Sequence, residues 1–300
     1  MVRYLDEDRV RAVLHWEPLI DAMESALASF SSGRVIQPLR NMITIEEGRR
    51  YLGIMPAIAE DVMGLKLVTF YPGNADTGVP THLATVILCR SDTGEPLAVM
   101  DGRLITEMRT AAVSAAVTRR LARPGSSVLA LLGSGTQAKA HLEVLGRVCH
   151  FREVRVWSRN GEHAKRFADE HDATAMDAES AVRGADVIVT ATNAREPILK
   201  GAWLKPGALV NAVGSPRPTW RELDDAAMAN TLVVDSREAV LHESGDVILS
   251  KATIYAEVGE IFTGRTAPAR GVTIIFKSVG IAVEDVAAAR LVFEAVGREF

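Results

Sequence analysis

The segment that most constrains the fold is residues 127–137, which read S-V-L-A-L-L-G-S-G-T-Q. Residues 128–132 form a continuous apolar run of strand length, and Gly133-Ser134-Gly135 is typical of a tight turn. Over residues 136–148 the apolar side chains recur at helical spacing. A strand, a glycine turn and a helix in this order form the βα unit of dinucleotide-binding folds.

Each position in this unit has a physical role. Gly133 permits the turn, Gly135 lets the backbone approach a pyrophosphate, and the small Ala138 lets the helix pack on the strand. The helix N-terminus, at Thr136 and Gln137, offers unpaired N–H groups and a partial positive charge to phosphates. An ordinary βα turn is the alternative, but strand and helix are both present here. The segment therefore predicts dinucleotide binding by Gly133, Ser134, Gly135, Thr136 and Gln137.

After this unit the chain continues to alternate strands with helices. That alternation implies parallel pairing and a doubly wound α/β sheet, the Rossmann arrangement. We expect this domain to span residues 123–280. Its predicted strands are 128–132, 154–157, 187–191, 208–213, 231–234 and 272–276.

The preceding part of the chain has a different pattern, in which two helices are followed by short strands separated by turn signals, as in an antiparallel sheet. A long alanine-rich helix follows at 103–121, and Ala122-Arg123-Pro124-Gly125 ends it. The other predicted elements are helices 6–13, with Asp6 as its N-cap, and 17–30, and strands 42–45, 51–55, 65–70, 84–88 and 97–100.

The last predicted helix, 283–295, follows the final strand and has no further strand to feed. We therefore expect it to pack on the N-terminal part of the chain. The predicted fold class is α/β, with a doubly wound Rossmann domain plus a discontinuous α+β substrate domain made of residues 1–122 and 281–300.

Composition excludes several other classes of protein. The 300 residues are 48% hydrophobic and 24% charged, with a net charge of −4 and no basic stripe, which argues against a nucleic-acid partner. Cys89 and Cys149 are the only cysteines, and they indicate buried thiols in a reducing compartment and no metal site. The N-terminus is charged and no apolar run reaches spanning length. We expect a cytoplasmic protein without a membrane partner.

The end of the second Rossmann strand distinguishes NAD from NADP. An acidic residue there binds the ribose 2′-hydroxyl, whereas an arginine accommodates a 2′-phosphate. In this chain Ser158-Arg159-Asn160 stands at that point and carries no carboxylate. A solvated loop arginine is the alternative, but the position favours a role for Ser158, Arg159 and Asn160 in binding NADPH in preference to NADH.

Five segments of the chain match the motifs of one known family: 37–40, 65–72, 100–102 with Thr106 and 109–112, 132–138, and 243–246. Through them the sequence resembles, over nearly its whole length, the ornithine cyclodeaminase and mu-crystallin family. Within the family it is most similar to the mu-crystallin branch, the NADPH-dependent ketimine reductases, through the segments 214–223 and 275–280. The resemblance implies a homodimer built on the N-terminal domain.

One departure from the family pattern bears on the reaction. Cyclodeaminases carry an aspartate in a G-G-D-C-P-G-type turn, whereas this chain has Ser215 and Pro216 there and no carboxylate until Glu222. A charged substrate amine would lose its partner, and an unpaired buried charge is costly. Cyclodeamination of ornithine or lysine is therefore less favoured than reduction.

The resemblance also implies roles for Arg40 and Lys66 in binding a substrate carboxylate. Lys66 alternates with Leu65 and Leu67, so it faces one side of its strand. From the residues alone, a lysine on the solvated face is the commoner case. In a desolvated site Lys66 could instead protonate the imine nitrogen, because lysines shift their pKa readily when buried.

Three further positions gain candidate roles from the resemblance. Arg109 is implied to reach both the substrate and the cofactor pyrophosphate, together with Thr81 and His82, although His82 could equally be a strand-edge histidine. Glu243 matches a carboxylate near the substrate nitrogen, where it would stabilise a cationic iminium, and the alternative is a helix-end residue beside the turn at Gly245.

The resulting hypothesis is hydride transfer from NADPH to a cyclic ketimine such as Δ1-piperideine-2-carboxylate or Δ1-pyrroline-2-carboxylate. Lys66, Glu243 and Arg40 are the predicted catalytic residues. The residues expected around the nicotinamide half of the cofactor are Thr190, Thr192, Val213, Gly214 and Ser278. Two alternatives stay open: a cyclodeaminase or alanine dehydrogenase-like amino-acid enzyme, and a non-catalytic NADPH-binding protein.

Overall fold

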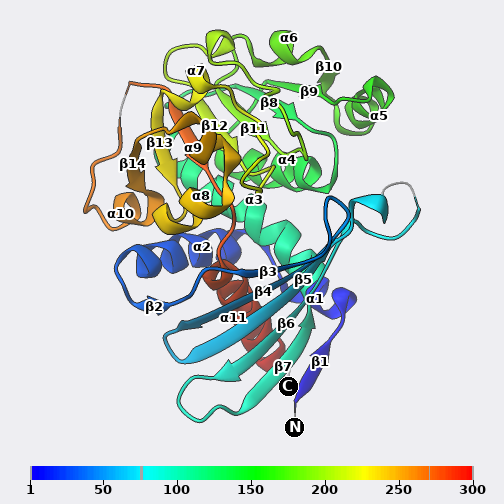
Figure 1. Ribbon diagram of the computed structural model, residues 1–300, viewed down its shortest axis with the longest axis vertical. Coiled ribbons are helices and arrows are strands. Elements are labelled where there is room, and N and C mark those ends of the chain that lie inside the picture. The colour runs from blue at the N-terminus through cyan, green and yellow to red at the C-terminus, as the bar shows by residue number, and fades with distance from the viewer. Residues whose placement is uncertain (1, 75–76, 270, 299–300) are drawn as a thin grey trace. The chain divides into compact units, whose positions relative to one another are not determined.

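The structure, a computed structural model, describes residues 2–74, 77–269 and 271–298. The chain divides into two compact units. Unit 1 contains the residues up to Arg109 and those from Ile281 onward, and unit 2 runs from Thr110 to Gly280. The boundary lies inside helix α3 (Gly102–Leu121), whereas the predicted boundary at residue 122 lies at the end of the same helix. Figure 1 labels the elements of both units.

Unit 1 is built on a seven-stranded sheet with the order β1-β7-β6-β5-β4-β2, in which β3 pairs with β4. The sheet is antiparallel as predicted, except that β1 runs parallel to β7. Sequence patterning missed β1 and β2 because strands this short show no alternation. The strands are β1 (Arg3–Leu5), β2 (Val35–Ile36), β3 (Asn41–Glu46), β4 (Arg50–Ala59), β5 (Val62–Phe70), β6 (His82–Arg90) and β7 (Pro96–Asp101).

The helices of unit 1 are α1 (Glu7–Val13), α2 (Trp16–Ser31) and α11 (Ala282–Arg298), with a short 3₁₀ turn η1 (Pro72–Asn74). Asp6 caps α1 as predicted, because its Oδ1 accepts a hydrogen bond of 3.0 Å from the Arg9 N–H. Helix α11 contacts α2 and strands β4, β5 and β6. It approaches the sheet closely at Gly64, where an added Cβ would lie 2.7 Å from Val286 Cγ2. The last helix therefore covers one face of the sheet.

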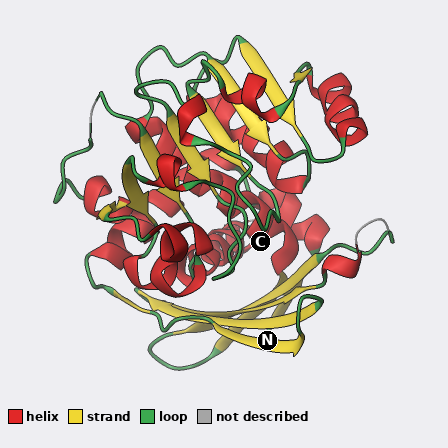
Figure 2. Ribbon diagram, turned by 45° about the horizontal axis from the view of Figure 1, so that its top comes forward, coloured by secondary structure: helices red, strands yellow, loops and turns green. Residues whose placement is uncertain are grey.

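Unit 2 contains an eight-stranded sheet with the order β10-β9-β8-β11-β12-β15-β13-β14, and every pair is parallel. Figure 2 shows helices flanking these strands. The predicted doubly wound fold is confirmed, with β10 and β14 added at the edges. The strands are β8 (Val128–Leu132), β9 (Glu153–Trp157), β10 (Thr174–Ala175), β11 (Val187–Thr190), β12 (Leu209–Ala212), β13 (Thr231–Val234), β14 (Ile254–Glu257) and β15 (Ile274–Lys277).

Helices connect these strands and contribute a buried polar contact. His141 of α4 is fully buried, with Nε2 2.9 Å from Ser114 Oγ of α3 and Nδ1 2.7 Å from the Gln137 carbonyl. Burial lowers the pKa of His141 to about 4, so the ring is neutral at physiological pH. The helical elements that follow α3 are α4 (Thr136–Val148), α5 (Gly161–His171), α6 (Ala178–Val182), η2 (Gly201–Trp203), α7 (Asp225–Met228), α8 (Arg237–Glu243), α9 (Gly245–Ser250) and α10 (Val258–Phe262).

Among the described residues, no helix combines the length and the apolar character needed to cross a membrane.

Candidate active site

Lys66 lies on the buried face of the unit 1 sheet. Its side chain is 2% exposed, whereas the neighbouring Leu67 is 41% exposed on the opposite face. Lys66 Nζ lies 2.6 Å from Asp285 Oδ2 on α11. The solvated-face alternative for Lys66 is therefore wrong, because α11 covers the side of β5 to which this lysine points.

Arg109, the last residue of unit 1 in α3, is held by the same helix. Its Nε donates to Asp285 Oδ1 at 3.1 Å and its Nη1 donates to Glu284 Oε2. Both carboxylates are fully buried in the first turn of α11. Arg40, which is half-buried just before β3, is near enough to act electrostatically on Lys66. We call Arg40, Lys66, Arg109, Glu284 and Asp285 the Lys66 cluster.

The electrostatics of the Lys66 cluster suit an anionic ligand. Its three cations and two carboxylates give a formal charge of 3 − 2 = +1. Burial lowers the pKa of Lys66 most, Asp285 raises it, and Arg109 and Arg40 lower it again, to a value of about 8. Lys66 is therefore protonated at neutral pH, yet it can release its proton more readily than an ordinary lysine can.

Thr81 and His82 lie at the start of β6. His82 is exposed, and its Nδ1 lies 3.2 Å from Thr81 Oγ1. The His82 ring stacks on Phe70 of β5, with 4.4 Å between the ring centroids. These contacts orient the imidazole at the edge of the strand while leaving it accessible to solvent.

In unit 2 the turn after β8 has the form that the sequence predicts. Gly133 has φ +124°, and an added Cβ would lie 2.6 Å from the Ala191 carbonyl oxygen, so only glycine fits. Gly135 is the N-cap of α4 and has no side chain with which to cap the first N–H groups of this helix. An added Cβ at Gly135 would meet open space. The residues present thus fit a dinucleotide pyrophosphate.

Ser158, Arg159 and Asn160 follow β9. Asn160 is the N-cap of α5, and its Oδ1 accepts a hydrogen bond of 3.0 Å from the Glu162 N–H. Arg159 is exposed and Ser158 is half-buried. The Asn160 oxygen is thus occupied by the helix, which leaves the guanidinium of Arg159, the Ser158 hydroxyl and the Asn160 amide N–H₂ as groups that suit a phosphate.

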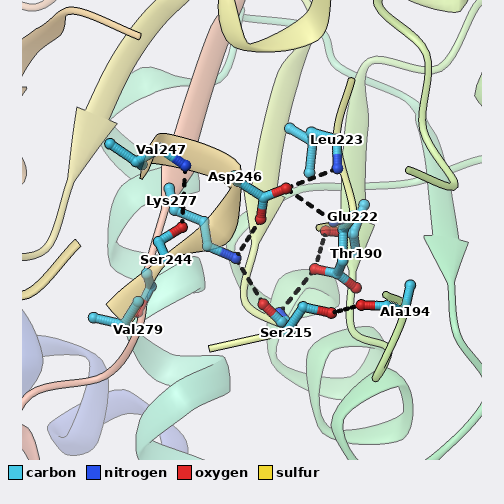
Figure 3. Close-up of polar contacts among 12 residues, drawn as sticks. Thr190, Ala194, Ser215, Glu222, Leu223, Ser244, Asp246, Val247, Lys277 and Val279 are labelled. Atoms are coloured by element: carbon cyan, nitrogen blue, oxygen red, sulfur yellow. Dashed lines mark hydrogen bonds and ion pairs between the residues drawn. The ribbon is translucent and has the colours of Figure 1, made fainter. Parts of the chain in front are cut away.

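The carboxylate of Glu222 lies at the ends of β11 and β12 and is fully buried (Figure 3). Its Oε1 accepts hydrogen bonds from the Thr192 N–H and Oγ1, both at 2.7 Å. Its Oε2 accepts from Thr190 Oγ1 at 2.7 Å and from the Gly214 N–H at 3.0 Å. Burial raises the pKa of Glu222, against the lowering effects of Lys277 and the two threonines.

A second buried pair completes this arrangement. Lys277 Nζ lies 2.9 Å from Asp246 Oδ2 and donates to the Gly214 carbonyl oxygen at 2.6 Å. Asp246 Oδ1 accepts from the backbone N–H groups of Glu222, at 2.8 Å, and of Leu223, at 2.9 Å. We call Gly214, Glu222, Asp246 and Lys277, together with Thr190 and Thr192, the Glu222 cluster.

Ser215 and Glu243 lie close to the Glu222 cluster in sequence. Ser215 is buried with φ +49°, and its hydroxyl donates to the Ala194 carbonyl oxygen at 2.6 Å. Glu243 is half-buried at the end of α8. The Ser215 hydroxyl thus connects the loop after β12 to the loop after β11. Glu243 is the last residue of α8, the helix-end position that the sequence offered as the alternative to a role beside the substrate nitrogen.

Ser278 is held by a different buried carboxylate, Asp235. Asp235 Oδ2 accepts from Ser278 Oγ at 2.9 Å and from the backbone N–H groups of Val279 and Gly280 at 2.8 Å. Burial raises the pKa of Asp235, while these donors oppose that effect. The Ser278 hydroxyl is therefore directed into the protein.

Several of these buried charged residues were not predicted as site residues from the sequence. Lys277 and Asp246 lie in segments that carry the family resemblance, so the sequence did contain a motif that could have pointed to them. Glu284, Asp285 and Asp235 lack such a signal, because their partners are far away in the sequence. The described residues contain no group of three or more His, Cys, Asp or Glu side chains that could hold a metal ion.

Comparisons with known proteins extend over the whole chain. The family described as "Ornithine cyclodeaminase/mu-crystallin family" matches residues 4–299. Ketimine reductase mu-crystallin of Mus musculus is 50% identical over 285 residues, which cover 92% of this chain and 91% of that protein.

Solved structures also match the chain over nearly its whole length. Thermococcus litoralis Δ1-pyrroline-2-carboxylate reductase, in complex with NADH and L-proline, superposes with a TM-score of 0.94 and 33% identity, covering 100% of this chain and 98% of that one. An archaeal alanine dehydrogenase dimer with bound NAD gives a TM-score of 0.93 and 33% identity, covering 99% and 97%. These superpositions confirm the predicted fold class.

Proposed function

Because the chain belongs to the ornithine cyclodeaminase/mu-crystallin family, we propose that it is an NADPH-dependent reductase of cyclic ketimines. The substrates would be Δ1-piperideine-2-carboxylate and Δ1-pyrroline-2-carboxylate, and the products cyclic L-amino acids. The observation that carries the proposal is the buried, cation-rich Lys66 cluster, which combines a site for a carboxylate with a lysine able to give up a proton.

The reaction consumes one ketimine, one NADPH and one proton. When bound, NADPH would supply the hydride to the imine carbon, and the C=N π electron pair would move to nitrogen. Arg40 and Arg109 would hold the substrate carboxylate, since guanidinium groups form charge-assisted hydrogen bonds with carboxylates. Lys66 would protonate the imine nitrogen, which makes the carbon a better hydride acceptor. Glu243 would stabilise the cationic iminium.

Two observations support reduction over cyclodeamination. Ser215 stands where cyclodeaminases carry an aspartate, and its hydroxyl already donates to a backbone carbonyl. The nearest following carboxylate, Glu222, accepts four hydrogen bonds from its own unit. Neither residue offers a free carboxylate to a substrate amine.

A substrate panel tests the proposal. Purified protein is offered NADPH or NADH with each cyclic ketimine, and also ornithine, lysine, and alanine with NAD(P)⁺. We expect steady loss of absorbance at the nicotinamide band with NADPH and a ketimine. Ammonia release without an absorbance change would indicate a cyclodeaminase, NAD(P)⁺ reduction with alanine a dehydrogenase, and binding without turnover a non-catalytic protein.

The preference for NADPH rests on Arg159, which follows β9 where no acidic residue stands. Arg159→Glu should raise the KM for NADPH about 10- to 100-fold, the effect of losing a charged hydrogen bond, and should leave the KM for NADH nearly unchanged. Arg152→Glu, at the opposite end of the same strand, is the matched control. An unchanged NADPH/NADH ratio in Arg159→Glu would refute this assignment.

We also propose a homodimer built on the outer face of the unit 1 sheet. The apolar residues exposed on this face, opposite Lys66, are Ile43, Ile58, Leu67, Leu83 and Ile87. An apolar face of this kind is typical of a protein interface, and a sheet of the same chain is complementary to it.

Leu67→Asp should convert a dimer to a monomer in light scattering. Leu241→Asp, exposed on α8, should not.

A further inference from the structure

Three of the residues predicted around the nicotinamide use their hydrogen-bond donors within unit 2. The Thr190 hydroxyl, the Thr192 N–H and hydroxyl, and the Gly214 N–H all donate to Glu222. The backbone carbonyl of Gly214 accepts from Lys277. Both backbone polar groups of Gly214 are thus engaged by buried charged side chains.

The two loops are also tied to each other directly. The Val213 N–H donates to the Thr190 carbonyl at 3.0 Å, and the Ser215 N–H donates to the Thr192 carbonyl at 2.9 Å. Glu222 accepts hydrogen bonds from residues of both loops. The segments that follow β11 and β12 therefore form one cross-linked unit whose common partner is a single carboxylate.

We propose that Glu222 is a positioning residue that fixes the loops lining the nicotinamide half of the cofactor. The hydrogen-bond donors of Thr190, Thr192 and Gly214 then bind Glu222. These three residues affect the cofactor only through the loop conformation that Glu222 holds in place. The inference rests on the proposed function only in its assignment of these loops to the nicotinamide half.

The geometry favours a carboxylate over its amide. Each oxygen of Glu222 meets one backbone N–H, from Thr192 on Oε1 and from Gly214 on Oε2. A threonine hydroxyl can rotate and accept a hydrogen bond, but a backbone N–H can only donate. In Glu222→Gln the amide N–H₂ must therefore face one of these two N–H groups, whichever way the side chain is turned.

The effect of Glu222→Gln on cofactor binding can be measured with two ligands that share the adenosine half of the cofactor. NADPH carries the nicotinamide, whereas adenosine 2′,5′-bisphosphate carries only the adenosine half with its 2′-phosphate. In Glu222→Gln we expect the Kd for NADPH to rise about 10- to 100-fold, because either the Thr192 N–H loses its acceptor or the Gly214 N–H keeps only its longer bond of 3.2 Å to the Thr190 carbonyl. The Kd for the bisphosphate should stay within about twofold of wild type. Glu238→Gln, the same change at an exposed site on α8, is the control.

Equal weakening of both ligands would show a general structural role and overturn the proposal, as would unchanged binding of NADPH. If circular dichroism shows that Glu222→Gln does not fold, Thr190→Val removes a single side-chain donor. It should weaken NADPH about 3- to 10-fold and spare the bisphosphate, and failure to do so is equally decisive. A wild-type protein that binds NADPH without reducing ketimines would refute the proposed function and leave this inference standing.

Discussion

The Lys66 cluster of unit 1 and the Glu222 cluster of unit 2 each contain a buried lysine paired with a buried aspartate. The distances are similar, 2.6 Å from Lys66 to Asp285 and 2.9 Å from Lys277 to Asp246. Their surroundings differ. Lys277 also donates to a backbone carbonyl, and Asp246 also accepts from two backbone N–H groups, so this pair is part of the chain's own framework.

The Lys66 pair has other charged side chains as its neighbours. Asp285 is shared with Arg109, and Arg109 and Arg40 both lower the pKa of Lys66. A buried ion pair is therefore a poor sign of catalysis when backbone groups surround it. Excess positive charge around a desolvated lysine is a better sign, since that combination holds an anion and makes the lysine more acidic.

The largest expected effect comes from removing Lys66. Lys66→Met should lower kcat/KM for the ketimine about 10²- to 10⁴-fold, the usual contribution of a general acid. The Kd for NADPH should change little. Steady-state kinetics and a fluorescence titration provide the two measurements. Near-normal turnover in Lys66→Met would remove the distinction between the two clusters.

Removing Lys277 should act on stability. Lys277→Met leaves the buried Asp246 without its cation, and breaking a buried pair typically costs about 3–5 kcal/mol. The free energy of unfolding from urea denaturation should fall by this amount. Lys66→Met should cost less, because Asp285 keeps its bond to Arg109. A reversed order would contradict the framework role of Lys277.

His141 is a buried titratable group whose two ring nitrogens contact uncharged groups, the Gln137 carbonyl and the Ser114 hydroxyl. Its pKa falls from 6.5 to about 4 on folding. Below pH 6.5 this histidine becomes protonated in the unfolded chain, whereas in the folded chain it stays neutral down to about pH 4. Stability should therefore decline through this window, by about 1.4 kcal/mol per pH unit. His141→Gln should flatten that part of a urea-denaturation pH series, and an unchanged slope would contradict the assignment.

The pH profile of the reaction gives the smallest effect. Lys66 must be protonated to act as an acid, and its pKa is about 8. We expect kcat/KM to fall above that pH, by about tenfold per unit once the lysine is deprotonated. Lys66→Arg stays charged at all accessible pH values, so any residual activity should lack this alkaline limb. A limb that persists in Lys66→Arg would belong to another group.

The sequence predicted those parts of the molecule that depend on local pattern. The apolar run before Gly133 and the helical spacing after it specify the βα corner, and repeated alternation specifies the parallel sheet. The two-residue strands β2 and β10 escaped prediction because so short a segment has no measurable period.

The side-chain partnerships could not be predicted in the same way. Strand alternation placed Lys66 on one face of β5, but which face is buried depends on α11, which comes from the other end of the chain. Glu222 shows the same limit, since three of its four donors belong to Thr190 and Thr192, which precede it by 32 and 30 residues. Long-range pairing of this kind leaves no periodic trace in a single sequence.

Asp285 offers one oxygen to Lys66 and the other to Arg109. A substitution at this single position therefore removes a counter-ion from two cations at once. For enzyme engineering, this makes the first turn of α11 a poor place to diversify, even though it is remote in sequence from both cations. Libraries aimed at larger or smaller rings are better directed at residues around Arg40, which lies just before β3.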